Sequence, residues 1–87
     1  MKNMEQLIKI DYLSNLSEGE TGEIVQVRGK PEVHRYLNSQ GLMLGRSVSV
    51  DGALTTPQNQ FITIHAGDRV AVIDREIASN VKVQILN

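Results

Sequence analysis

The chain contains two histidines, which could bind a metal through their imidazoles, and no cysteine that could provide a thiolate ligand. His34 precedes Asn38 by one helical turn, and Glu32, two residues before His34, would face elsewhere on a helix. A metal site needs ligands that converge from several elements, and the pattern indicates no such set. We therefore interpret His34 and His65 as solvated or partly buried side chains, and we expect no metal site and no cofactor.

The patterns that would indicate catalysis are equally weak. No serine sits in a nucleophile elbow, and the acidic residues are spread along predicted loops and strand ends. A paired-carboxylate enzyme needs two acids in one pocket, which a sequence alone does not reveal. Gly19-x-x-Gly22 lacks the lysine and the following helix of a phosphate-binding loop, so we expect a turn there. We expect no catalytic residue.

Length and charge restrict the remaining classes. The 87 residues allow one domain with a modest core. The net charge is −1, the nine lysines and arginines are scattered, and aromatic residues are few. A basic face and a base-stacking platform are therefore not expected, nor is nucleic-acid binding. No apolar run approaches membrane-spanning length and no signal-peptide core is visible, so we expect a cytoplasmic protein without direct membrane insertion.

A short helix is predicted over residues 32–40. Pro31 suits the first helical position, and Glu32 favours the positive end of the helix dipole. The apolar positions of one helical face are Val33, Tyr36 and Leu37.

The end of this helix is also predicted. Gly41 can take the left-handed conformation that closes a helix, and Leu42 would then pack back on Leu37. Gly45 opens a turn into Ser47–Val50, which alternates at the strand period.

Strand patterns fill most of the rest of the chain. Further strands are predicted over 23–28, 61–65, 69–73 and 81–85, with 61–65 and 69–73 forming a hairpin. The off-pattern Ile24 indicates a β-bulge in the first of these. Asp74 is expected to cap a helical turn at 75–79, which a left-handed Asn80 would end. A turn at 13–16 is expected to bury Leu13 and Leu16.

These elements predict a mainly β protein, a small closed or nearly closed barrel with one short helix laid against it. Residues 1–9 read as a lead-in or tail, and residues 10–87 as the single domain.

Three ordered patterns over Ile10–Leu86 are similar to the signatures of FeoA-type ferrous iron transport proteins. They are Leu13-x-x-Leu16-x-x-Gly19-Glu20-x-Gly22-x-Ile24-x-x-Val27, Arg35-x-Leu37-x-x-x-Gly41-Leu42-x-x-Gly45-x-x-Val48-x-Val50, and Arg69-Val70-Ala71-Val72 followed by Glu76-Ile77-Ala78-x-x-Val81-x-Val83. The domain also resembles the carboxy-terminal domain of iron- and manganese-dependent transcriptional regulators.

The resemblance implies an SH3-like barrel and, at the family level, an association with transition metal ions. It further implies a cytosolic accessory role through protein–protein contact with the cytosolic region of a FeoB-type permease, which would hold the chain at the inner face of the membrane. Weak self-association is a further expectation. The alternative function is a stand-alone regulatory or interaction domain of the metal-regulator type.

One position departs from the family pattern. Proline commonly precedes the second glycine of the central signature, and here that position is Leu44. Because nothing in the pattern assigns Met43 and Leu44 to the core, we expect a partner-binding patch there, joined by Leu54 from the 51–59 loop. The alternative is that Met43 and Leu44 close the barrel end. The residues expected to serve the structural motif are Gly19, Gly22, Leu37, Gly41, Leu42 and Gly45.

Overall fold

Six antiparallel strands form one sheet in the order β1-β6-β2-β3-β4-β5. The computed structural model describes residues 8–51 and 60–86. The strands are β1 (Lys9–Tyr12), β2 (Thr21–Val27), β3 (Ser47–Val50), β4 (Phe61–Ala66), β5 (Arg69–Asp74) and β6 (Val81–Ile85). A 3-10 turn, η1 (Leu13–Asn15), and two helices, α1 (Pro31–Ser39) and α2 (Arg75–Ala78), complete the fold.

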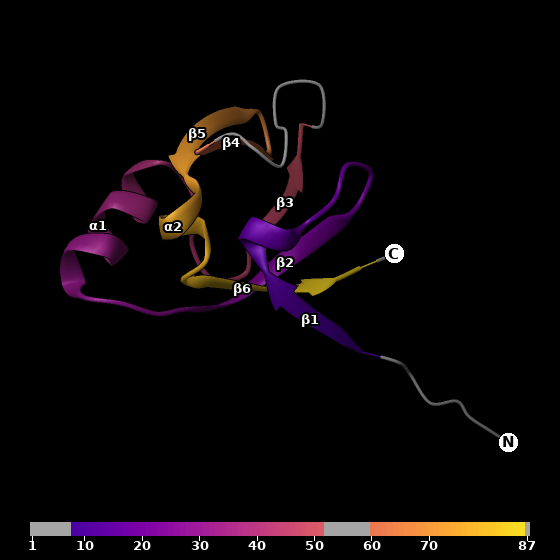
Figure 1. The fold of residues 1–87 in the computed structure, drawn as a ribbon, viewed down its shortest axis with the longest axis horizontal. Helices are drawn as coiled ribbons and strands as arrows, with labels where there is room; N and C mark the ends of the chain where they lie inside the picture. The colour runs from indigo at the N-terminus through magenta and orange to yellow at the C-terminus, as the bar shows by residue number, and fades with distance from the viewer. Residues whose placement is uncertain (1–7, 52–59, 87) are drawn as a thin grey trace, which may run out of the picture.

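The sheet bends on itself, so that β4 and β5 lie across from β1, β6 and β2, with α1 to one side (Figure 1). No pairing joins β1 to β5 within the described ranges. Instead α2 contacts β4, β5 and η1, and η1 contacts β6. The predicted mainly β class and small SH3-like barrel are confirmed, and helical turns bridge the two ends of the sheet.

The core fills the inside of this bent sheet. Ile62 and Ile64 of β4 and Val81 and Val83 of β6 are buried in it. The expected turn at 13–16 consists of η1 and the following Leu16, and both Leu13 and Leu16 are buried. The other buried apolar residues are Ile24, Leu37, Leu42, Val48, Val50, Ala66, Ala71, Ile73 and Ala78.

Strand β1 was not predicted, and Lys9, which the sequence places in the lead-in, is its first residue. It pairs with β6 from Lys9↔Ile85 to Tyr12↔Lys82. None of its four side chains is fully buried, so the strand has no inward hydrophobic pattern for a sequence to show. The Lys82 ammonium lies 5.7 Å from the centre of the Tyr12 ring and adds a cation–π contact to this edge.

Strand β2 starts at Thr21, two residues before the predicted start at residue 23. It ends at Val27, one residue before the predicted end at residue 28. The register against β6 shifts between Ile24 and Gln26, which confirms the predicted bulge. Ile24 is buried, both Val25 and Gln26 are exposed, and Val27 again packs against the core, because the bulge places two consecutive residues on the outer face.

The two glycines of the first signature have different positions. Gly19 lies in the loop before β2, whereas Gly22 lies within β2, between β3 and β6. A Cβ atom at Gly22 would lie 3.0 Å from the Cβ of Val83. Gly22 therefore allows β2 and β6 to approach more closely than an alanine would.

Helix α2 begins as predicted, because the Asp74 carboxylate accepts a hydrogen bond from the Glu76 N–H at 2.8 Å. The helix ends at Ala78 rather than at residue 79. The prediction for Asn80 is wrong, since no non-glycine residue among those described has a positive φ. Asn80 ends the helix through hydrogen bonds instead: its N–H donates to Ile77 O and its Nδ2 to Glu76 O.

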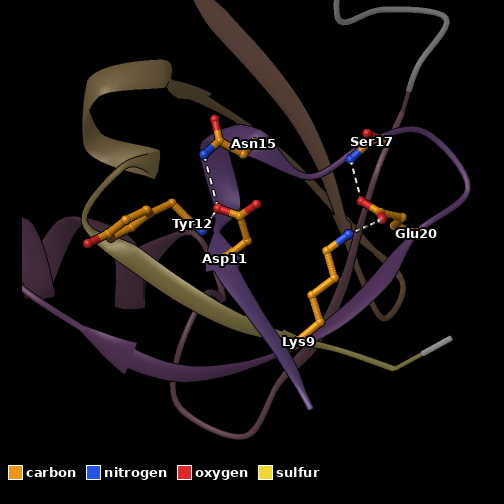
Figure 2. Close-up of polar contacts among 6 residues, drawn as sticks. All are labelled: Lys9, Asp11, Tyr12, Asn15, Ser17 and Glu20. Carbon is orange, nitrogen blue, oxygen red and sulfur yellow. Dashed lines mark hydrogen bonds and ion pairs between the residues drawn. The ribbon is translucent and has the colours of Figure 1, made fainter. Parts of the chain in front are cut away.

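Two side chains fix the loop before β2. Glu20 accepts a hydrogen bond from the Ser17 N–H at 2.8 Å and pairs with the Lys9 ammonium at 3.7 Å (Figure 2). The loop is thereby tied to the first residue of β1.

Asp11 fixes the junction between β1 and η1 (Figure 2). Its Oδ1 accepts hydrogen bonds from Asn15 Nδ2 at 3.0 Å and from the Tyr12 N–H at 2.7 Å. The Asn15 bond, followed by the Tyr12 bond, lowers the pKa of Asp11 below its ordinary value of 3.8.

We predict an acid-dependent stability contribution from Asp11. A carboxylate with a lowered folded-state pKa stabilises the fold above pH ~4 and loses this effect as the pH falls through the folded-state pKa. Asn15→Ala should raise the Asp11 pKa, measured by NMR titration. It should also destabilise the protein more at pH 6 than at pH 2.5 in chemical denaturation. An equal effect at both pH values would contradict this assignment.

Candidate functional site

Helix α1 ends at Ser39, one residue earlier than predicted, and Gly41 caps its end as predicted. Gly41 has φ +84° and its N–H donates to Asn38 O at 3.0 Å. The N–H of Leu42 donates to Leu37 O at 2.9 Å. These two bonds are the pair that defines a Schellman motif. The predicted left-handed Gly41 is confirmed, and Leu42 returns to Leu37 through its backbone hydrogen bond, with both side chains in the core.

A side chain from β5 reinforces the end of α1. The Arg69 Nη2 donates a hydrogen bond to Ser39 O at 3.1 Å. A Cβ atom at Gly41 would lie 3.2 Å from Arg69 Nη1, so the guanidinium rests against this glycine. A cation at the carboxyl end of a helix is also favoured by the helix dipole.

The next four residues, Met43 to Arg46, form a β-turn. The Arg46 N–H donates to Met43 O at 3.1 Å, and Gly45 has φ +85°. Because Leu44 has no positive φ, the turn is type II. Ile24 of β2 fixes the turn, since its O accepts from the Gly45 N–H at 2.8 Å and its N–H donates to Arg46 O.

This connection separates three consecutive apolar residues. Leu42 is fully buried, whereas Met43 is 38% exposed and Leu44 is 65% exposed. Leu44 therefore does not close the barrel end as a core residue. The predicted patch residues Met43 and Leu44 lie next to each other at the surface, while Leu54 lies outside the described residues.

A groove of about 380 Å³ runs between α1 and this turn. Its lining residues are Val27, His34, Leu37, Asn38, Leu42, Met43 and Leu44. Sequence reasoning noted His34 and Asn38 one helical turn apart but assigned them no role. Their i, i+4 spacing was the available signal for a shared position on the groove side of α1.

The second histidine lies elsewhere. His65 of β4 has its Nε2 3.1 Å from the Asp51 Oδ2 and does not line the groove. Within residues 8–51 and 60–86, no three histidine or acidic side chains are grouped so as to hold a metal ion.

A second exposed apolar group lies on the β4–β5 hairpin, and sequence reasoning did not single it out. Its members are Phe61 of β4 and Val70 and Val72 of β5, all more than half exposed. Val70 is paired with His65 and Val72 with Thr63.

Comparison with known proteins places the domain. A family model described as "FeoA domain" matches residues 12–85. The chain belongs to the FeoA family. A crystal structure of an iron uptake regulatory protein (FeoA) superposes with a TM-score of 0.82 at 27% identity, covering 90% of this chain and 100% of that one. The solution NMR structure of the FeoA protein from Chlorobium tepidum superposes with a TM-score of 0.76 at 28% identity, covering 87% of this chain and 70% of that one.

The FeoA fold also occurs within larger regulators. A manganese-dependent transcriptional repressor superposes with a TM-score of 0.79 at 18% identity, covering 94% of this chain but 43% of the repressor. At that identity, the likeness shows the fold alone. A search of curated protein sequences finds no match to the chain. Neither α1 nor α2 is long and apolar enough to cross a membrane, nor is any other helix among the described residues.

We predict that Gly41→Val destabilises the fold by about 1–3 kcal/mol, because a β-branched residue is strained at positive φ. The added side chain would also press on Arg69. Gly41→Asn is the matched control, since asparagine tolerates the left-handed conformation and should cost less. Thermal and denaturant unfolding measure both variants. An unchanged melting temperature for the valine variant would show that the cap is unimportant.

We also predict that the isolated chain has no tight ferrous-iron site. Anaerobic titration should give only weak, unsaturable binding, and His34→Ala and His65→Ala should leave it unchanged. A stoichiometric site of micromolar affinity or better, lost in either variant, would contradict this.

Proposed function

We propose that this FeoA-family chain is a cytosolic, non-catalytic accessory protein of ferrous iron uptake. It would act by binding the cytosolic region of a FeoB-type permease through Met43, Leu44 and the adjoining groove. Membership of the FeoA family supports the role in ferrous iron transport. The proposal that this is the docking surface rests on one observation: the exposed side chains of Met43 and Leu44 lie beside a groove with an apolar floor.

Leu44 is the informative residue of this surface. It occupies the second position of a type II turn, where proline is favoured because its fixed φ suits the turn. The leucine therefore brings no advantage for the turn itself, but presents a large apolar side chain to solvent. Clustered exposed apolar side chains mark interaction sites, and methionine adapts its shape to different partners.

The second candidate is a stand-alone regulatory or interaction domain. The similarity to the manganese-dependent repressor supports it at the level of fold. A small barrel hosts many functions, so the fold does not favour this candidate over the first. The two candidates differ in one observable: the first requires direct binding to the permease.

We predict that Met43→Ser combined with Leu44→Ser weakens binding to the cytosolic region of a cognate FeoB-type permease by at least about tenfold. The two side chains would lose burial worth roughly 1.5–3 kcal/mol each at a well-packed interface. Isothermal titration calorimetry measures the affinity, and circular dichroism checks the fold. The serine variant should also fail to restore ferrous iron uptake in cells that lack the protein.

Two controls separate binding from folding. Leu44→Pro suits the type II turn, so it should keep or raise stability by about 0.4–1 kcal/mol while removing the leucine contact. Val70→Ser removes a similar exposed side chain from β5 and should leave binding intact. Absence of binding by the unmodified protein would contradict the proposal and favour the stand-alone role. If both the Met43→Ser/Leu44→Ser variant and the Leu44→Pro variant still bind the permease region with unchanged affinity, the partner surface lies elsewhere.

A further inference from the structure

We infer that the groove receives an acidic amphipathic segment of the partner. Its apolar side chains would enter the groove and its carboxylates would face Arg46 and Arg69. This inference rests on the proposed function and specifies the chemistry of the partner at that surface.

Two guanidinium groups lie at the 41–46 connection: Arg46 is its last residue, and Arg69 reaches it from β5. The Arg69 head rests on Gly41, beside the groove residue Leu42, and the Arg46 side chain belongs to the same β-turn as Met43 and Leu44. A Cβ atom at Gly67 would lie 3.5 Å from Arg46 Nη1. Since Gly67 and Arg69 belong to one hairpin turn, both guanidiniums lie where that turn meets the 41–46 connection.

Within the described part of the chain, Arg69 donates to Ser39 O at the negative end of α1, and no carboxylate pairs with either arginine. The ion pairs Lys9–Glu20 and His65–Asp51 include neither Arg46 nor Arg69. Asp68 is the one carboxylate of the hairpin turn, and it lies beyond ion-pair distance of both arginines. Together the 41–46 connection and the 66–69 turn contain two arginines and one carboxylate.

The groove itself contributes no negative charge. Its lining combines five apolar side chains with one imidazole and one amide. A partner that covers it therefore needs apolar side chains for the floor, and its carboxylates would reach Arg69 by extending past Leu42 to Gly41. Opposite charges around an apolar centre chiefly increase the association rate and fix the orientation of the complex.

The partner segment does not add as a strand. Adding a strand requires an exposed sheet edge, and the sheet ends in β1 and β5. The groove is lined from α1, the 42–44 segment and Val27 of the interior strand β2. Contact is therefore made through side chains, which is how an amphipathic helix binds in a groove.

Association kinetics with the cytosolic region of a FeoB-type permease test this inference. Arg46→Glu should lower the association rate constant on the order of tenfold while changing the dissociation rate little. Raising salt from 50 to 300 mM should reduce the difference, because screening weakens charge attraction. Lys82→Glu is the matched control, with the same charge change on β6, and should change the rate less than about twofold. Arg46→Gln, which removes the charge without reversing it, should give an intermediate rate.

Two designed helical peptides give a second measurement that needs no permease. One carries leucines on one face with glutamates on the other, and its counterpart replaces every glutamate by lysine. The acidic peptide should shift the NMR signals of the Met43 and Leu44 methyl groups, and the basic peptide should not.

The outcomes separate the two proposals. If the permease region does not bind the unmodified protein, the proposed function fails. If it binds but Arg46→Glu behaves like Lys82→Glu and salt has no effect, the acidic partner is wrong while the accessory role stands. Equal shifts from both peptides, or shifts from the basic peptide alone, also overturn the acidic partner.

Discussion

The left-handed conformation of Gly41 is the constraint on which the functional surface depends. It ends α1, returns Leu42 to Leu37, and directs the chain into the type II turn at Gly45. Between these two glycines the chain must bury one leucine and then expose the next two residues. The groove, the exposed Met43 and Leu44, and the position of Arg69 all follow from the same connection.

The barrel holds this connection in place from three directions. Ile24 of the bulged strand β2 binds the turn through two backbone hydrogen bonds, and Arg69 of β5 binds the carboxyl end of α1. Leu37 and Leu42 reach the core, so that folding of the barrel and formation of the groove are coupled. A rigid support of this kind lowers the entropy cost of binding, because the surface is formed before the partner arrives.

The sequence predicts the elements in which a local rule and the hydrophobic pattern agree. The cap of α1, the hairpin of 61–65 with 69–73, the bulge near Ile24 and strand β6 are of this kind, and the structure confirms them. Strand β1 was missed because an edge strand without buried side chains has no periodicity. Asn80 was predicted wrongly because its side-chain amide satisfies the helix end, which backbone propensity does not anticipate.

The site likewise has a part that the sequence predicts and a part that it does not. Exposure of Met43 and Leu44 follows from local assignments, whereas the contributions of His34, Arg46 and Arg69 require the fold.

NMR mapping of the labelled chain with the cytosolic region of a FeoB-type permease tests the account most directly. We expect the perturbed amide and methyl signals to cluster on His34, Asn38, Met43, Leu44 and Arg46. Signals that instead cluster on Phe61, Val70 and Val72, with the groove unaffected, would contradict it and assign the partner to the β4–β5 hairpin.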